Sequence, residues 1–160
     1  MKIRFAHIDD VPAFVEIGRR IHATTRFQIY PFQPEQVTRT LTQLINSKGG
    51  GKYVFLVAED SAGVPAGGLI GCLEQHIFSD RPIANIVHFD VLPEKRMGGA
   101  ALRLLTAFRK WAENRGVLEL CAGVNSGEDL DKLDRFFKKL GYTAVGGNYA
   151  MPLSYAQRPG

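Results

Sequence analysis

The feature that most constrains the fold is a strand, turn and helix pattern at residues 91–102. An apolar run ends at Val91, the turn carries Arg96 and the pair Gly98-Gly99, and an amphipathic helical pattern begins at once. The first N–H groups of a helix have no intrahelical partner, and the helix dipole makes that end positive. Glycine lets an anion approach these amides, and arginine adds a forked cationic donor. A bare Gly-Gly pair would indicate only a tight turn, but this ordered combination predicts an anion site suited to phosphate.

Strands and helices are expected to alternate around this motif. Apolar runs and period-two patterns predict strands over residues 3–6, 53–59, 66–78, 84–92, 117–124, 142–145 and 149–153. Helical spacing predicts four helices: from Asp10 to His22, from Pro34 to a glycine-rich break at residues 48–51, from the motif to Gly116, and a last one ending at Gly141. A hairpin followed by alternating helices and strands indicates an α/β protein, with a mixed sheet covered on both faces. We expect a single domain over residues 1–160, because no internal repeat or linker is visible.

Composition and charge limit the class of partner. The chain has 160 residues, 45% of them hydrophobic and 22% charged, which is typical of a soluble globular domain. A net charge of +4 suits a ligand that carries phosphates. Basic residues are scattered apart from Lys138-Lys139, so the sequence does not predict a nucleic-acid partner.

The sequence also indicates where the protein resides. No stretch approaches the roughly 18 apolar residues of a membrane span, and the first residues lack an apolar leader, so we expect no membrane partner and a cytoplasmic location. Cys72 and Cys121 both lie in apolar runs, where free thiols usually behave as small buried hydrophobes. A disulfide between neighbouring strands stays open at this point.

Two motifs together resemble those of the GNAT family of N-acetyltransferases, which transfer acetyl from acetyl-CoA to an amine. The first is Val91-Leu92-Pro93 followed by Arg96-Met97-Gly98-Gly99-Ala100-Ala101, and the second is Phe136-Phe137-Lys138-Lys139-Leu140-Gly141-Tyr142. With the order of elements, the resemblance covers nearly the whole chain. It implies a GNAT-like fold of six to seven strands flanked by about four helices.

The resemblance also implies where acetyl-CoA would bind. In such folds the strand before the motif and the strand after its helix splay apart, and the pantetheine arm lies between them. The implied cofactor-binding residues are Phe89, Asp90 and Val91 for the arm, Arg96, Met97, Gly98, Gly99, Ala100 and Ala101 for the pyrophosphate, and Asn125 and Phe137 from the later elements.

His88 and Asp90 are the candidates for the catalytic base. Two residues spaced by two in a strand share one face, and a histidine titrates near neutral pH. The alternatives are that this face is simply the wetter one, that Asp90 caps the turn, or that His88 is a hydrogen-bonded core group. Glu74, His76 or a chain of waters could serve instead. No metal is expected, because His76 and His88 lack further ligands at metal-binding spacing.

The usual general acid of the family is absent. The fourth helix carries Phe137 where many relatives have a tyrosine, and phenylalanine has no proton to give. Thiolate is a good leaving group, so the reaction does not strictly need an acid. Tyr149 and Tyr142 are the substitutes in the sequence, and Tyr142 matches an apolar position of the family.

The expected function is an acetyl-CoA-dependent N-acetyltransferase, in which a primary amine of a small molecule or protein attacks the thioester directly. The alternative is a non-catalytic acyl-CoA-binding or interaction domain on the same fold, suggested by Phe137. The aromatic segment at residues 23–32 and the second helix are expected to form the acceptor wall. The sequence leaves the acceptor, the acyl chain and the oligomeric state open, a homodimer included.

Overall fold

The computed structural model describes residues 1–47 and 51–153. The chain divides into two compact units: residues 1–17 with 33–122, and residues 18–32 with 123–160. Most of the predicted glycine-rich break, residues 48–50, lies outside the described residues.

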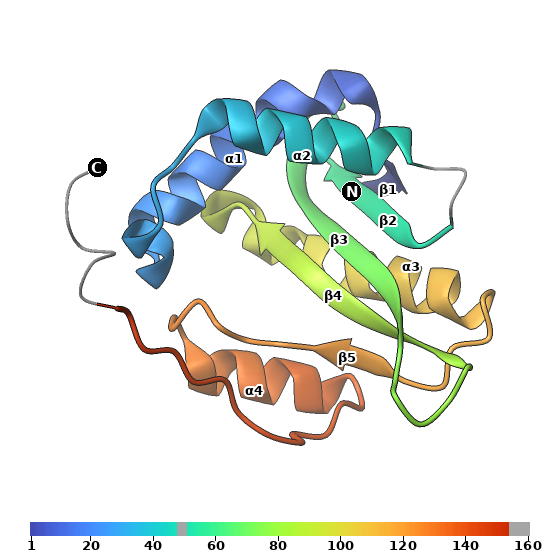
Figure 1. Ribbon diagram of the computed structural model, residues 1–160. Helices are drawn as coiled ribbons and strands as arrows, with labels where there is room; N and C mark the ends of the chain where they lie inside the picture. The colour runs from blue at the N-terminus through green and yellow to red at the C-terminus, as the bar shows by residue number, and fades with distance from the viewer. Residues whose placement is uncertain (48–50, 154–160) are drawn as a thin grey trace. The chain divides into compact units, whose positions relative to one another are not determined.

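The first unit contains a five-stranded sheet in the order β1-β2-β3-β4-β5 (Figure 1). Its strands are β1 (Lys2–Phe5), β2 (Tyr53–Glu59), β3 (Pro65–Gln75), β4 (Pro82–Val91) and β5 (Leu120–Ala122). The first four pair antiparallel, and β5 pairs parallel to β4. This confirms the predicted α/β class with a mixed sheet, because the crossover from β4 to β5 contains a helix.

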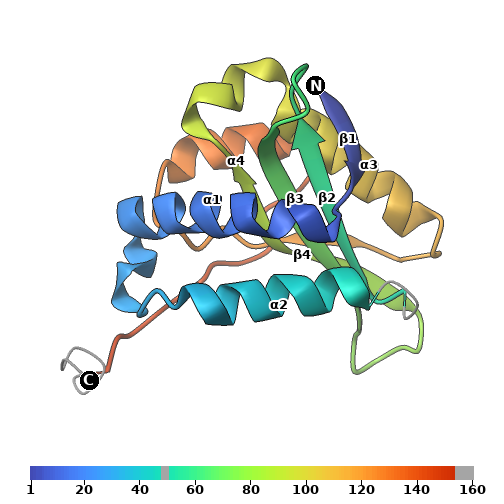
Figure 2. The same ribbon diagram turned by 90° about the horizontal axis from the view of Figure 1, so that it is seen from above.

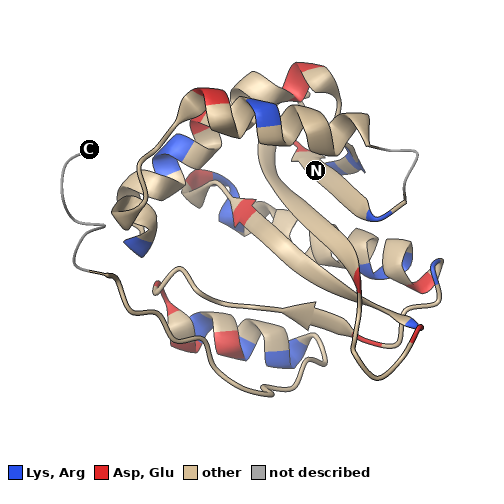
Figure 3. Ribbon diagram, viewed as in Figure 1, with Lys and Arg blue, Asp and Glu red and all other residues tan. Residues whose placement is uncertain are grey.

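The structure has four α-helices within the described residues, as predicted. They are α1 (Val11–Thr24), α2 (Pro34–Asn46), α3 (Ala100–Glu113) and α4 (Leu130–Lys139), and the 3-10 turns are η1 (Ile8–Asp10), η2 (Arg26–Ile29) and η4 (Pro93–Gly98). Acidic and basic residues occur together on α1, α3 and α4 (Figure 3). None of the described helices combines the length and the apolar character needed to cross a membrane.

Two glycines of β3 show which helix covers each face of the sheet. A Cβ at Gly68 would lie 2.6 Å from the ring of Phe14 on α1, whereas a Cβ at Gly71 would lie 2.3 Å from the ring of Phe108 on α3. Residues 68 and 71 point to opposite faces, so α1 begins against one face and α3 lies on the other (Figure 2). Phe108 and Leu69 are fully buried in the core between α3 and the sheet.

The predicted number of six to seven strands is wrong, since the described residues form five. The expected closing hairpin at residues 142–145 and 149–153 forms no strand, and the strand expected at residues 117–124 is reduced to Leu120–Ala122. Val145 and Tyr149 are 93% and 98% exposed, so their apolar side chains gain nothing from pairing there. The side-chain Nδ2 of Asn148, in the expected turn, donates to the backbone carbonyl of Val124 at 3.0 Å. Propensity alone does not make a strand without a packed partner surface.

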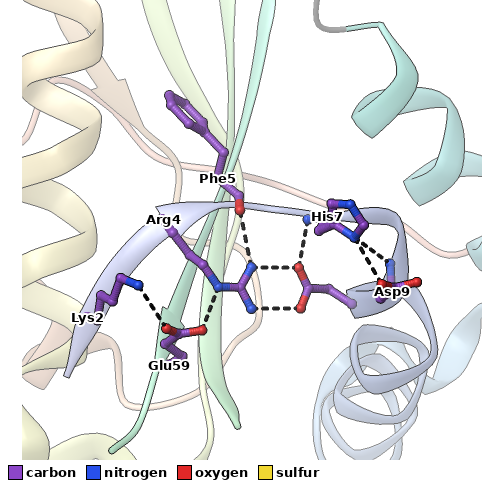
Figure 4. Close-up of polar contacts among 7 residues, drawn as sticks. Lys2, Arg4, Phe5, His7, Asp9 and Glu59 are labelled. Atoms are coloured by element: carbon purple, nitrogen blue, oxygen red, sulfur yellow. Dashed lines mark hydrogen bonds and ion pairs between the residues drawn. The ribbon is translucent and has the colours of Figure 1, made fainter. Parts of the chain in front are cut away.

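An ion-pair network joins β1, η1 and β2 (Figure 4). The Arg4 guanidinium donates to both carboxylate oxygens of Asp10, at 2.8 and 2.9 Å, and to Glu59 at 2.5 Å. Asp10 also accepts from the backbone N–H of His7 at 2.7 Å, which closes a capping box on η1. Asp10 is the buried charged residue of the described core. The network therefore fixes how the first helix leaves the edge strand.

Both cysteines are free. Cys72 on β3 and Cys121 on β5 both pair with Asn85 of β4, so a whole strand separates them. Two strand spacings amount to about 9.6 Å, beyond the reach of a disulfide.

Candidate functional site

The predicted anion motif lies at the junction between η4 and α3, in the first unit. Arg96, Met97 and Gly98 belong to η4, Gly99 is the N-cap of α3, and Ala100 begins the helix. The turn predicted between strand and helix is a 3-10 turn. Gly99 has φ 77°, a left-handed conformation that favours glycine, and no atom from beyond its neighbouring backbone lies within 4 Å of where its Cβ would be.

The first turn of α3 leaves amides available beside that open space. The N–H of Arg103 donates to the carbonyl of Gly99 at 3.1 Å, which is the first bond of the helix. The N–H groups of Ala100, Ala101 and Leu102 precede it and have no acceptor within the helix. Ala100 is fully buried, so only a small side chain fits at the start of the helix. The amides of Ala101 and Leu102, which are not buried, and the helix dipole can bind an anion.

Arg96 bonds to the end of β4. Its Nε donates to the carbonyl of Val91 at 3.2 Å, and the residue is otherwise exposed. Its neighbour Lys95 donates to a carboxylate oxygen of Asp60 at 3.1 Å. The motif's cation therefore lies where β4, η4 and α3 meet.

A β-bulge in β4 decides which face the candidate base residues occupy. Ile70 pairs with His88 but Gly71 pairs with Ile86, so Val87 is an extra residue in β4. Beyond the bulge, His88 and Asp90 share the face of Gly68, which α1 covers, while Ile86 shares the face of α3. Simple alternation would have put residues 86, 88 and 90 on one face. No residue type at position 87 signals the bulge in advance.

One edge of β4 is open after the bulge. Pairing with β5 ends at Ile86 opposite Ala122, and no strand of the described chain pairs there with residues 87–91. The N–H of Leu92 donates to Ala66 of β3, so by alternation the backbone groups of Val91 and Phe89 point away from β3. Of the three residues predicted to bond the pantetheine arm, Phe89 and Val91 present backbone groups on the open side, whereas the backbone groups of Asp90 point to β3.

Burial raises the pKa of the Asp90 carboxyl above its ordinary value, while the nearby His88 and Arg96 oppose the rise. His88 itself is exposed. A carboxylate with a raised pKa is a better proton acceptor than an ordinary one. The described residues contain no group of three or more His, Cys, Asp and Glu side chains arranged to hold a metal ion.

The remaining predicted residues belong to the second unit. The backbone carbonyl of Asn125 accepts a hydrogen bond from Arg26, and Tyr149 is 98% exposed. Phe137 is half-buried and packs edge-on against Tyr142, with ring centroids 5.2 Å apart. This packing explains why position 137 accommodates a phenylalanine.

The aromatic segment predicted as an acceptor wall also lies in the second unit and is organised by its own rings. Phe27 stacks near Tyr30 with ring centroids 6.3 Å apart, and the guanidinium of Arg26 lies 5.3 Å from the ring centroid of Phe27. The ring of Phe32 lies beside the tilted ring of His22 and beneath the guanidinium of Arg19. These rings are partly engaged with cations of the same unit.

Solved acetyltransferases share this fold. Glucosamine-6-phosphate N-acetyltransferase from Arabidopsis thaliana has a TM-score of 0.74 at 15% identity, covering 96% of this chain and 98% of that one. An aminoglycoside acetyltransferase from an uncultured soil metagenomic sample has a TM-score of 0.71 at 21% identity, covering 96% and 95%. Ribosomal-protein-alanine N-acetyltransferase from Brucella melitensis biovar Abortus 2308 has a TM-score of 0.69 at 16% identity, covering 96% and 100%. No curated protein matches the chain in sequence.

The family is shown by the sequence itself. Residues 18–142 match the model of the acetyltransferase (GNAT) family, a span that includes the bulged strand, the glycine motif and the fourth helix. The match covers more than half of the chain, and the chain belongs to the acetyltransferase (GNAT) family.

Proposed function

We propose that the chain is an acetyl-CoA-dependent N-acetyltransferase that acts as a single domain and transfers acetyl to a primary amine of a small molecule or protein. The observation that carries this proposal is the junction at which the open edge of β4 leads through η4 to the left-handed Gly99 and the amides of α3. The junction offers edge amides for an arm and helix amides for phosphates. Acetyl-CoA has both parts in one molecule.

In this proposal different residues of the chain bind different parts of the cofactor. The amides of Ala101 and Leu102 would hold the pyrophosphate, with Arg96 beside them. The backbone groups of Phe89 and Val91 would bond the pantetheine arm, as strand edges bond peptides. Bound acetyl-CoA would supply the activated acyl group.

Asp90 is the residue we propose as the base. An amine acceptor is protonated near neutral pH and cannot attack until a proton is removed. The raised pKa of the Asp90 carboxyl suits that step, and its position on β4 puts it beside the residues proposed for the arm. The amine nitrogen would then bond to the acyl carbon as the carbon–sulfur bond breaks and thiolate leaves with the electron pair. The proton that the nitrogen releases would pass to this thiolate, which leaves a neutral amide and a free thiol. Tyr149 stays a candidate proton donor from the second unit.

The acceptor is proposed only as an amine. The proteins named above are acetyltransferases of glucosamine-6-phosphate, of aminoglycosides and of a ribosomal-protein alanine, so the fold serves amines of very different size. The rings of residues 23–32 favour an acceptor with an aromatic or uncharged body.

A non-catalytic acyl-CoA-binding domain is the second candidate. The observation in its favour is Phe137, which stands at the usual acid position and packs on Tyr142.

The test combines CoA titration with thiol release from acetyl-CoA across a panel of amines. We expect CoA binding and turnover on at least one amine, and a large loss of CoA affinity in Arg96→Glu. Arg109→Glu, on the exposed side of α3, is the control for the same charge change. Binding without turnover on any amine would favour the second candidate, and unchanged affinity in Arg96→Glu would place the phosphates elsewhere.

A further inference from the structure

The segment η4 is largely exposed although it carries the motif's cation. Glu94, Arg96 and Gly98 are all exposed, and Met97 is 99% exposed. Burial therefore does little to fix the backbone between the end of β4 and the start of α3. A segment with few buried apolar contacts opens easily unless other bonds hold it.

Lys95 connects this segment to a distant turn. Its Nζ donates to Oδ2 of Asp60 at 3.1 Å, across 35 residues of sequence. The Lys95 side chain is 39% exposed and that of Asp60 is 19% exposed, so this ion pair is better shielded than one in open solvent.

The carboxylate that receives Lys95 is held in place by its own turn. Oδ1 of Asp60 accepts from the backbone N–H groups of Ala62 and Val64, at 2.9 and 3.0 Å. The backbone N–H of Asp60 donates to Val64, and Gly63 closes the turn with φ 76°. One oxygen is thus used by the β2–β3 turn, and the other is aimed at Lys95. The acceptor is fixed before Lys95 arrives, so little side-chain freedom is lost on its side.

We propose that Asp60 and Lys95 form a positioning pair for the phosphate-binding segment. This inference rests on the proposed cofactor. Asp60 would touch no ligand, and Lys95 would form its ion pair with Asp60 and not with phosphate. By anchoring η4 to the β2–β3 turn, the pair sets where Arg96, Gly98 and Gly99 stand relative to the amides of α3.

The test uses Asp60→Asn and Lys95→Met, separately and together, in titrations with CoA and with pantetheine, which lacks the pyrophosphate. Asparagine keeps an oxygen for the two turn amides, so Asp60→Asn should leave the turn intact. We expect each single variant to weaken CoA binding about fivefold, the factor that corresponds to roughly 1 kcal/mol. The double variant should lose no more than either single one, and pantetheine affinity should stay unchanged.

The control is Glu113→Gln, which removes the carboxylate of an ion pair with Arg109 on the same unit, with side chains 58% and 67% exposed. It should leave both ligands unaffected. Unchanged CoA affinity in Asp60→Asn overturns the proposal, and so does a loss confined to Lys95→Met, which would make Lys95 a phosphate ligand. An equal loss of affinity for pantetheine also overturns the proposal, because it would indicate that the variants loosen the protein as a whole and not the phosphate-binding segment. A wild-type protein that binds no CoA would remove the proposed function itself, an outcome distinct from these three.

Discussion

Gly99→Ala tests the anion site with a control that the same helix supplies. Gly99 has φ 77° at the start of α3, and Gly116 has φ 66° just past its end. At both positions no atom lies within 4 Å of the missing Cβ, so alanine meets no steric clash. It meets only the left-handed backbone, which costs a residue with a Cβ about 1–2 kcal/mol. For a chain of this size each variant should therefore lower Tm by about 2–8 °C.

The two variants should differ in CoA affinity. A Cβ at Gly99 stands where an anion would approach the first amides of α3, whereas Gly116 is at the opposite, negative end of the helix dipole. Losing one charge-assisted hydrogen bond costs about 1.5–3 kcal/mol, or about 10- to 150-fold in Kd. Calorimetric titration with CoA, beside thermal unfolding of each variant, measures both quantities. If Gly99→Ala binds as tightly as wild type, or if both variants weaken equally, the amides are not the site.

Two further predictions concern carboxylates with shifted pKa values. Asp10→Asn should cost about 2 kcal/mol in the free energy of unfolding at pH 7, while Asp9→Asn, whose carboxylate is 89% exposed, should cost under about 0.5 kcal/mol. The Arg4 hydrogen bonds hold the pKa of Asp10 below its usual range. The stability that Asp10 contributes is therefore present above about pH 4 and disappears as the pH falls through the folded-state pKa. If the difference in the free energy of unfolding between wild type and Asp10→Asn did not close in acid, the role given to Asp10 would be contradicted. Asp90→Asn should lower kcat by about a hundredfold and remove the acidic limb of the kcat/KM profile, which the raised pKa of Asp90 places above the usual carboxyl range. If that limb persists in Asp90→Asn and is lost in His88→Gln, then His88 is the base.

What the sequence could predict depends on how local each feature is. The helices and the glycine motif follow from spacing and capping within a few residues, and the structure reproduces them. The bulge at Val87 lies opposite the step to Gly71, where the ring of Phe108 leaves no room for a Cβ, and no short pattern encodes it. The prediction of strands at residues 142–153 was wrong because a strand also needs a partner strand and a surface to pack on, and residue propensities do not specify these. The contact between Lys95 and Asp60 joins residues far apart in sequence and is equally invisible there.

The residues proposed to bind the cofactor and those proposed to bind the acceptor also differ in how local they are in the sequence. Every group proposed to hold acetyl-CoA in the first unit lies within residues 89–102, so one contiguous stretch carries the bulged strand's edge, the turn and the helix start. The residues proposed for the acceptor come from residues 18–32 and 123–153, two separate stretches that form the other unit. Substitutions there can change which amine is accepted without altering the amides of α3. The solved acetyltransferases that share this fold at 15–21% identity are named for glucosamine-6-phosphate, aminoglycosides and a ribosomal-protein alanine, which is consistent with this separation.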